Sequence, residues 1–495
     1  MLTDILGRVH RRRLDNKEER QKYYGNLTSY LSLSPPTSIF DIFQAWRIFP
    51  VKTEHSLASL DNQRFDFIGG GISGVTSAYV AGELARFLGL HWEIHVWDRL
   101  DGQGLKSTKD SAARIRTSMF GSPEEIIGNL VTSIFFENLE SILKKGAQRA
   151  GRELSFDVHT DVYRCGYLWL FENDQHDEAI AKNKQILRQL GIPTFVLSTV
   201  DVAEILMPGV NKRRFTHAYF CPTDAYVSPT NIVNAIYRYA KEVLHVQFHF
   251  EEEIDRIDIT TGHKISFTTK HVLTENKQTY QTDNLGITAG ACSKVLGERI
   301  VINSSIYDKP IPVIPRARQI TYLSGFTDSE LIEFDPFTIF MGQGAYFSRE
   351  SPGSRRVMFA FANNKDPEIL SHAVFNRTHP TDDYFCDVVM DQGRLDGIHC
   401  AISLNSDRLH IVGHGGNLYG ETVDGHYLVG LLRTIQDAGP TGRIGINAAH
   451  NGHGIMSSLG TATQLVCRLA GIFNEESRLH DPSRIMSGYG TATRI

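Results

Sequence analysis

The spacing of apolar positions changes twice between residues 64 and 98. A short apolar run, Phe65–Ile68, is typical of a buried strand and ends at three consecutive glycines. Small residues then recur on one narrow face at helical spacing, and alternating apolar residues from 92 to 96 predict a second strand. This strand ends at Asp98, so the pattern predicts a strand, a glycine turn, a helix and a strand that ends in an acid.

Each part of this unit suits a dinucleotide. Gly69 allows a sharp exit from the strand, Gly71 lets a pyrophosphate approach the backbone, and Gly74 lets the helix lie close to the sheet. The free N–H groups and the dipole of the helix start favour phosphate, and Asp98 can accept hydrogen bonds from a ribose. The unit predicts dinucleotide binding but does not by itself distinguish FAD from NAD.

The remaining pattern predicts two domains with interleaved segments. The nucleotide domain is expected to be α/β and Rossmann-like, and the substrate domain to be α+β, built from strands and helices. Single helices are expected at Ile39–Phe49, with an apolar face that docks on its own domain or on a second subunit, and at 126–150. The expected divisions are a helical extension at 1–60, nucleotide-domain segments at 61–154, 222–300 and 410–475, substrate-domain segments at 155–221 and 301–409, and a tail at 476–495.

Composition narrows the function classes. The 495 residues exceed the usual size of a single core, and a net charge of -5 gives no reason to expect a nucleic-acid partner. No apolar run approaches the roughly 20 residues that span a bilayer, and the amino terminus lacks the apolar core of a secretory signal. The six cysteines show no CxxC spacing, which favours reduced thiols. A cytoplasmic enzyme is expected, with homo-oligomerisation left open.

Two arginines follow the nucleotide unit. Arg114 and Arg116 would share one face of a strand, and guanidinium groups match the geometry of carboxylates and phosphates. The alternative is a pair of surface arginines that bind Glu124 and Glu125. Five histidines in glycine loops lack metal-ligand spacing, so no metal is expected. These are His399, His414, His426, His450 and His453.

Several motifs together resemble a known family. They are GGGISG (69–74), ARIR (113–116), TAGACS (288–293), DGHYLVG (424–430) and NGHGIMSSLGTA (451–462). In this order they resemble the D-amino-acid oxidase superfamily, particularly its sarcosine oxidase and glycine oxidase branch, over roughly residues 64–472. The resemblance implies a flavoenzyme with an FAD-binding domain of the glutathione-reductase type and a mixed-sheet domain over the flavin.

The resemblance also implies site residues. Arg116 would place a substrate carboxylate, and the loop of His450 would face the flavin and the substrate. Monomeric sarcosine oxidases carry a lysine where this chain has Met456, and a flavin-linking cysteine near the position of Leu418, so non-covalent FAD is expected. The implied FAD contacts are Gly69, Gly71, Ile72, Ser73, Gly74, Asp98, Arg99, Ser111, Arg114, Ala289, Gly290, Gly452, His453, Gly454, Ile455 and Met456.

Three functions stay open. The first is oxidation of the C–N bond of an amino acid or secondary amine, by hydride transfer to flavin N5, giving an imine; electrons would pass to O2 or another acceptor. The second is oxidation of a C–O bond in a hydroxy acid or polyol phosphate. The third is a flavin-binding subunit of a larger complex, docked through residues 1–60.

Overall fold

The fold comes from a computed structural model of the chain. It describes residues 36–45, 52–53, 57–118, 121–207, 210–307, 311–332, 334–341, 344–351, 353–361, 408–437, 439 and 441–473. Most of the expected extension at 1–60 and the expected tail at 476–495 therefore lie outside the described residues.

A six-stranded sheet carries the glycine turn. Its order is β10-β3-β2-β14-β23-β22, with β22 antiparallel and the other five strands parallel. The strands are β2 (Arg64–Ile68), β3 (Glu93–Trp97), β10 (Gln247–His249), β14 (Asn284–Ile287), β22 (Leu428–Leu431) and β23 (Arg443–Ala448). All four residues of β14 are buried, as expected for a central strand covered on both faces. The predicted α/β, Rossmann-like architecture is confirmed.

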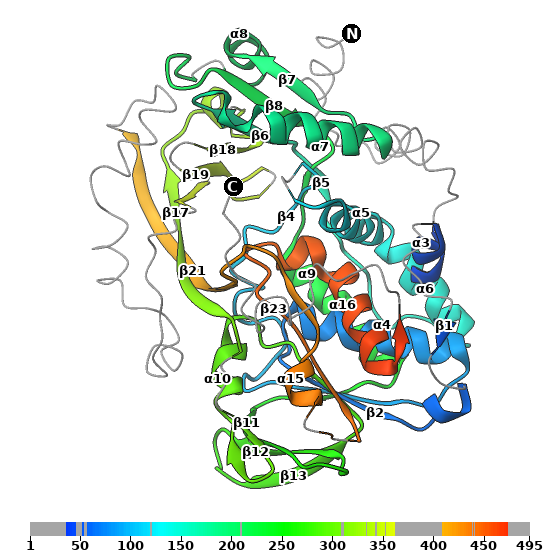
Figure 1. The fold of residues 1–495 in the computed structure, drawn as a ribbon. Coiled ribbons are helices and arrows are strands. Elements are labelled where there is room, and N and C mark those ends of the chain that lie inside the picture. The colour runs from blue at the N-terminus through cyan, green and yellow to red at the C-terminus, as the bar shows by residue number, and fades with distance from the viewer. Residues whose placement is uncertain are drawn as a thin grey trace.

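Helices cover one face of this sheet. Helix α4 packs against both α16 and α9, and α5 packs on α16 (Figure 1). The helices are α4 (Ile72–Leu88), α5 (Pro123–Glu137), α6 (Leu139–Arg149), α9 (Pro229–Glu242) and α16 (Gly454–Ala470). The short helix α15 (Arg433–Gln436) lies on the other face, where Ile435 is part of a separate hydrophobic cluster. The Ser228 side chain accepts a hydrogen bond from the Asn231 N–H, so it caps α9 as its sequence suggests.

The expectation of one helix at 126–150 is wrong. The chain forms α5 and α6 instead, with a bend of 71° at Asn138. Asn138 Nδ2 donates to the Ile134 carbonyl oxygen at 2.8 Å, and this local hydrogen bond competes with continuation of the helix. Among the described residues, no single helix has the length and apolarity to cross a bilayer; only the bent α5–α6 pair meets the test of length and composition.

The amino-terminal arm packs on its own domain where it is described. Helix α3 (Ile39–Ala45) lies against α5, with the side chains of Ile39 and Ile42 fully buried. The Phe40 ring stacks on Phe87 with centroids 4.2 Å apart. Strand β1 (Lys52–Thr53) pairs with β24 (Ile472–Phe473), which follows α16. These contacts agree with the first of the two docking alternatives.

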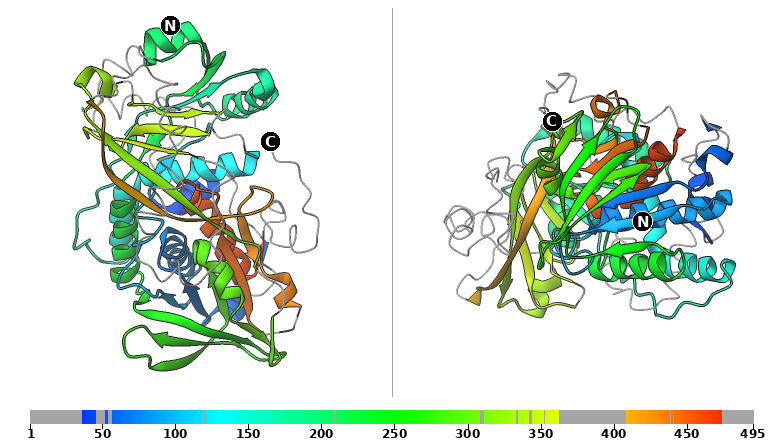
Figure 2. Two further views of the ribbon diagram at one scale, coloured as in Figure 1. Left: turned by 90° about the vertical axis from the view of Figure 1, so that its left-hand side faces the viewer. Right: turned by 90° about the horizontal axis from the view of Figure 1, so that it is seen from below.

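The other face of the six-stranded sheet meets a five-stranded sheet of order β13-β12-β11-β15-β16. This sheet lies at the far end of the molecule from the substrate domain (Figure 2). Its elements are β11 (Glu252–Ile259), β12 (Ile265–His271), β13 (Lys277–Thr282), β15 (Ile300–Ile302) and β16 (Ser305–Ile306); η4 (Gly290–Cys292) and α10 (Ser293–Gly297) precede β15.

An eight-stranded sheet forms the second domain, in the order β21-β17-β20-β19-β18-β6-β8-β7. The pairings include both parallel and antiparallel strands, as expected for a mixed sheet. Its strands are β6 (Tyr167–Phe171), β7 (Phe195–Ser198), β8 (His217–Cys221), β17 (Ile314–Ser324), β18 (Phe337–Phe340), β19 (Ala345–Arg349), β20 (Val357–Phe361) and β21 (His410–Glu421).

Short elements complete this domain. A three-stranded sheet of order β4-β9-β5 lies between the two domains. Its strands are β4 (Arg114–Ile115), β5 (Tyr163–Arg164) and β9 (Ala225–Tyr226). The helices are η2 (Asp174–His176), α7 (Asp177–Gln189), α8 (Thr199–Asp201), the π-helical η3 (Val202–Leu206) and α11 (Asp328–Ile332), and η1 (Leu57–Leu60) precedes β2 in the other domain.

Strand β21 corrects one expected boundary. Residues 410–475 were expected in the nucleotide domain, yet β21 pairs with β17 along almost its whole length, from Ser324↔His410 to Ile314↔Glu421. The two strands form a long ribbon that descends from the eight-stranded sheet toward the nucleotide domain (Figure 1). This pairing argues for a boundary near residue 422 rather than 410.

Candidate functional site

A cavity of about 280 Å³ lies at the carboxyl ends of β2, β3, β14 and β23. Ligands of open α/β sheets bind at this edge, outside the carboxyl ends of the strands. Other walls come from the loop after β3 and from the end of β21. Thirteen of the residues expected at the site line the cavity, namely Gly69, Gly71, Ile72, Ser73, Asp98, Arg99, Ser111, Ala289, Gly290, His450, Gly452, Gly454 and Ile455.

The first glycine turn is built from backbone that packs on backbone. Gly69 has φ +117°, and a Cβ on Gly74 would lie 1.8 Å from the Gly69 carbonyl oxygen. Helix α4 starts directly after Gly71, which provides no side-chain cap, and the Ile72 N–H donates to Thr108 Oγ1 at 3.1 Å. The start of α4 thus presents uncapped N–H groups beside the cavity, the arrangement that binds phosphate.

Asp98 closes this part of the cavity at the end of β3. Its Oδ2 accepts from the Gly70 N–H at 2.5 Å, and its Oδ1 accepts from the Leu100 N–H at 2.9 Å. Burial raises the pKa of Asp98 above its usual value, while these two N–H groups act in the opposite direction. The carboxylate is therefore fixed in place, with lone pairs left for the hydroxyls of a ribose.

The second helix start uses a tight loop. Ala449, Asn451 and Gly452 have φ values of +53°, +50° and +80°, so the chain turns sharply between β23 and α16. Helix α16 begins after His453, which gives no side-chain cap. Gly454 and Ile455 at this start line the same cavity. Two uncapped helix starts therefore face one space, and both favour negative charge on a bound group.

Part of the cavity was not expected. The loop after β3 supplies Lys106, Ser107 and Thr108, and β21 supplies Leu418, Tyr419 and Gly420. The Ser107 hydroxyl donates to the Leu418 carbonyl oxygen at 2.7 Å, which joins the two segments. The polar glycine-containing loop was the available signal for the first group. For β21, only the missing flavin-linking cysteine near Leu418 indicated proximity to the cofactor.

Arg116 and His453 form a contact beside the cavity rather than in its lining. Arg116 Nη1 donates to the Tyr167 hydroxyl at 2.5 Å, and Nη2 donates to His453 Nε2. The guanidinium carbon lies 5.1 Å and 5.3 Å from the ring centroids of Tyr167 and Trp169. Burial, then the charge of Arg116 and the neighbouring His450, hold the pKa of His453 well below its usual value. His453 is therefore neutral and accepts from the arginine.

Two buried donors at this contact have no hydrogen-bond partner among the residues that the structure describes. They are Arg116 Nε and His453 Nδ1, which carries the ring proton when Nε2 accepts. Buried polar groups without partners are rare in proteins. Their presence indicates that a ligand supplies acceptors here.

Four expected contacts lie elsewhere. Gly74 packs against Gly69 and does not line the cavity, and the Met456 side chain lies in the core of the nucleotide domain. Arg114 donates to Ser348 Oγ and to the Arg349 carbonyl oxygen, on the substrate-domain side. His453, the fourth, contacts Arg116. The geometry indicates a packing role for Gly74 and Met456.

His450 lines the cavity, and a buried residue of the nucleotide domain fixes its ring. Its Nε2 forms a 2.7 Å hydrogen bond with Oδ1 of the fully buried Asn447. The His453 N–H donates to the His450 carbonyl oxygen at 2.7 Å, so a backbone hydrogen bond joins the two histidines within one loop.

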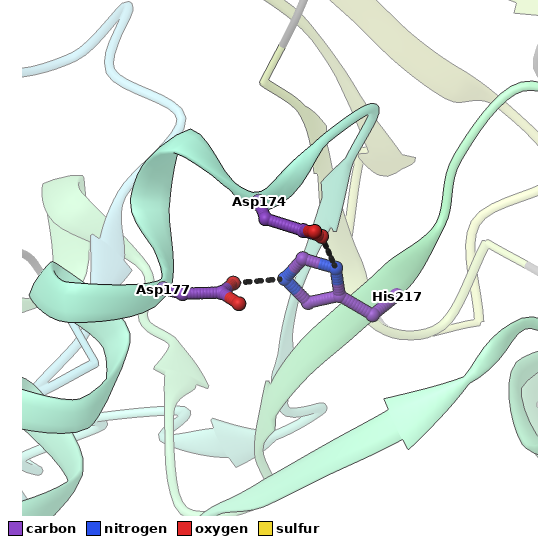
Figure 3. A group of neighbouring side chains, drawn as sticks. All are labelled: Asp174, Asp177 and His217. Carbon is purple, nitrogen blue, oxygen red and sulfur yellow. Dashed lines mark ion pairs between the residues drawn. The ribbon is translucent and has the colours of Figure 1, made fainter.

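A separate group of possible metal ligands lies on the eight-stranded sheet (Figure 3). His217 Nε2 is 3.1 Å from Asp177 Oδ1, and His217 Nδ1 is 3.9 Å from Asp174 Oδ1. Both carboxylates are exposed, and Asp177 lies in the first turn of α7, where the helix dipole favours negative charge. An ion pair at a helix start explains this group without a metal.

Together, a glycine turn suited to phosphate, an acid at the end of β3 and a second helix start over the same cavity are the features of a dinucleotide-binding protein. The sequence matches the model of the DAO family, described as FAD dependent oxidoreductase, over residues 68–468. The chain therefore belongs to this family, and FAD is its cofactor. The resemblance to the D-amino-acid oxidase superfamily is confirmed.

Solved structures show the same fold. Similar chains are L-proline dehydrogenase from P. horikoshii (TM-score 0.64, 19% identity, 86% of this chain and 99% of that one) and glycine oxidase from Geobacillus kaustophilus (0.59, 14%, 84% and 96%). L-α-glycerophosphate oxidase from Mycoplasma pneumoniae, with FAD bound, is also similar (0.60, 13%, 83% and 95%). Among curated proteins, none matches the sequence.

Proposed function

We propose that this enzyme oxidises the C–N bond of an amino acid or a secondary amine. The observation that carries the proposal is the Arg116 contact at the start of α16, where a half-buried guanidinium keeps an unpartnered Nε next to a neutral histidine. Such a group suits a substrate carboxylate, because charge-assisted hydrogen bonds to guanidinium are strong and directional. Two of the similar structures are L-proline dehydrogenase and glycine oxidase.

The residues of the chain have defined tasks in this reaction. Arg116 would bind the carboxylate and orient the carbon that is oxidised, with its own position fixed by Tyr167 and Trp169. His450, held by Asn447, would lie near the substrate, and the aromatic face of Tyr167 and Trp169 would exclude water. When bound, the flavin of FAD would accept the hydride that leaves the carbon. The imine product would then be hydrolysed by water.

We further propose that FAD is held without a covalent bond. Leu418 lines the cavity near the position of the linking cysteine in sarcosine oxidases and has no nucleophilic atom. Cys292 also lines the cavity, but burial raises its pKa to about 11, so its reactive thiolate is scarce at neutral pH. Acid precipitation of the yellow protein should leave all flavin in the supernatant; yellow pellets would contradict this.

Oxidation of a C–O bond is the second candidate. It is favoured by two neighbouring arginines, Arg114 and Arg116, which could bind a phosphate, and by the fold shared with L-α-glycerophosphate oxidase. Amine oxidation requires the substrate amine to be neutral when it reacts, whereas a hydroxyl requires a base to take its proton. No carboxylate among the described residues contacts Arg116, and the neighbouring His453 already accepts from it, which favours the amine.

The test is anaerobic reduction of the flavin in the purified protein. Candidate amines, hydroxy acids and glycerol phosphate are mixed with it in turn, and loss of the flavin absorbance band is followed in a stopped-flow instrument. The proposal expects bleaching by amines with a carboxylate. Bleaching by hydroxy compounds alone would support the second candidate. A flavin that no compound bleaches without an added protein would support the third reading, a subunit of a larger complex.

A further inference from the structure

Two arginines at the domain boundary have no carboxylate partner within the part of the chain that the structure describes. The Arg114 side chain is 8% exposed, and Arg116 Nε is a buried atom without a partner. Among the described residues, neither guanidinium forms an ion pair. A buried charge without a counterion is costly, which is why buried arginines in proteins are normally paired.

Both guanidiniums lie over one aromatic surface. Arg114 lies 4.8 Å and 5.0 Å from the ring centroids of Tyr226 and Phe337, while Arg116 lies over Tyr167 and Trp169. The Tyr167 ring joins the two halves, because its centroid is 4.6 Å from that of Phe337. Cation–π contacts offset part of the desolvation of an arginine but supply no negative charge.

The buried carboxylate of Asp224 accepts hydrogen bonds from the residues that follow Arg116, and not from either arginine. Asp224 is buried, and its oxygens accept from Thr117 N–H at 2.8 Å, from Thr117 Oγ1 at 3.0 Å and from the Ser118 hydroxyl. These bonds fix the backbone directly after Arg116. Burial raises the pKa of Asp224, while the hydrogen bonds from Ser118 and Thr117 act in the opposite direction.

The two arginines are spaced for one ligand. They stand two residues apart, at β4 and just beyond it, so their side chains leave the same face of the chain roughly 6–7 Å apart. Arg114 Nε, like Arg116 Nε, is buried and lacks a hydrogen-bond partner. An extended molecule with an anionic group at each end would supply an acceptor to both.

From this pair we infer that the substrate is an amino dicarboxylate, with one carboxylate on Arg116 and the second on Arg114. The inference rests on the proposed function, because the amine lies between the two carboxylates. It assigns Arg114 to substrate selection rather than to the flavin edge. A substrate with a single carboxylate would leave one buried guanidinium without an anion and would bind more weakly.

The first experiment uses ligands that cannot be oxidised. Malonate and succinate are titrated against acetate and propionate into the FAD-loaded enzyme, and binding is read from the change in flavin absorbance. The inference expects the better dicarboxylate to bind about 10- to 150-fold more tightly than the monocarboxylates, as expected for one added charged hydrogen bond. Equal affinity for both classes overturns it.

Variants of Arg114 test whether this residue causes the preference for dicarboxylates. Arg114→Gln should remove the dicarboxylate advantage while leaving acetate affinity unchanged, and Arg114→Lys should restore part of it. The control is Arg238→Gln, because Arg238 also lies over an aromatic ring, that of Phe156 at 4.1 Å, but away from the cavity. An equal loss for both ligand classes in Arg114→Gln overturns the inference. If that variant does not retain flavin, Arg114→Lys and the wild-type titrations decide the outcome.

A turnover experiment separates this inference from the proposed function. Amino dicarboxylates, monocarboxylic amino acids, hydroxy dicarboxylates and glycerol phosphate are compared by kcat/KM. A preference for amino dicarboxylates supports both statements. Equal rates with monocarboxylic amino acids would retain the proposed function and remove the inference. A preference for hydroxy dicarboxylates would support the binding of two carboxylates by the two arginines and would contradict amine oxidation.

Discussion

The two helix starts that face the cavity are built from different groups, namely backbone at α4 and side chains at α16. At the start of α4, glycines bring backbone against backbone, and the Asp98 carboxylate binds two N–H groups. At the start of α16, the contacts are between side chains, with His453 on Arg116 and His450 on Asn447. A phosphate site needs N–H groups, which every residue provides, whereas a substrate site needs particular side chains.

This difference predicts how each site fails. The α4 site should be lost when a substitution adds atoms, because there is no room for a Cβ at Gly69 or Gly74. The α16 site should be altered through removed groups, because its geometry depends on a few donors and acceptors. Four predictions test this contrast, from the largest expected effect to the smallest.

The largest effect is expected for Gly74→Ala. Its Cβ would lie 1.8 Å from the Gly69 carbonyl oxygen and 2.8 Å from Thr288 Oγ1, so helix and strand would have to separate. We expect protein that is unstable or colourless, measured by the ratio of flavin to protein absorbance and by the melting temperature. The matched control is Gly128→Ala within α5, where a Cβ meets nothing within 4 Å. A yellow, stable Gly74→Ala protein would contradict the packing argument.

A smaller but specific loss is expected for Arg116→Gln. The lost charged hydrogen bond should raise KM for an anionic amine by an amount equivalent to about 1.5–3 kcal/mol, with flavin content unchanged. Steady-state kinetics across a substrate series measures this. Arg238→Gln serves as the control for loss of a stacked arginine. An unchanged KM would remove Arg116 from the substrate site.

At the nucleotide end, Asp98→Asn should weaken FAD binding without changing KM. The amide keeps the size of the side chain but turns one of two acceptors, which bind the Gly70 and Leu100 N–H groups, into a donor. We expect the FAD dissociation constant of the apoprotein to rise by about tenfold. Asp61→Asn is the control, since Asp61 binds the His91 N–H away from the cavity. An increase in KM with normal FAD affinity would contradict this prediction, because it would give Asp98 a role at the substrate site instead of in FAD binding.

The smallest effect concerns pH. Folding holds the pKa of His453 well below its ordinary value of 6.5. As the pH falls through about 6.5, the imidazole therefore becomes protonated in the unfolded chain but stays neutral in the folded protein. The titration of this residue therefore has no effect on stability above that pH and destabilises the fold below it. Burial lowers the pKa of His249 to about 4, which acts in the same direction.

Melting temperatures from pH 8 to pH 5 test this sign. The wild-type melting temperature should fall toward pH 5, and His453→Gln should fall less steeply, with His249 still contributing. His263→Gln, at an exposed turn, should follow the wild type. If His453→Gln has the steeper fall, the imidazole is charged in the folded protein and the contact with Arg116 needs another explanation.

The same contrast explains what could be predicted from sequence. The α4 start is local: Gly69, Gly74 and Asp98 lie within one strand-helix-strand unit, and their spacing alone indicates their roles. The loop at α16 was also found, because its glycines and histidines are consecutive. Both belong to segments whose geometry is set by neighbouring residues, and both line the cavity in the structure.

Other parts depend on distant pairings that no local pattern encodes. Tyr419 reaches the cavity because β21 pairs with β17, a strand about 100 residues earlier. Tyr167 and Trp169 lie under Arg116 because β6 belongs to the other domain, and an alternating apolar run predicts a strand but not its neighbours. The break at Asn138 depends on one side-chain hydrogen bond that competes with a strongly helical pattern.

The β17–β21 ribbon also limits how this enzyme can be redesigned. Strand β21 is paired with the second domain along most of its length, with one register shift at Tyr322/Leu323, and it ends at the cavity, where a Cβ on Gly420 would lie 3.2 Å from Ala449 Cα. Inserting or deleting a single residue in its middle would turn every later side chain to the opposite side and remove Tyr419 from the cavity. Libraries that seek new specificities should therefore keep the length of β21 fixed and vary Tyr167, Trp169 and their neighbours instead.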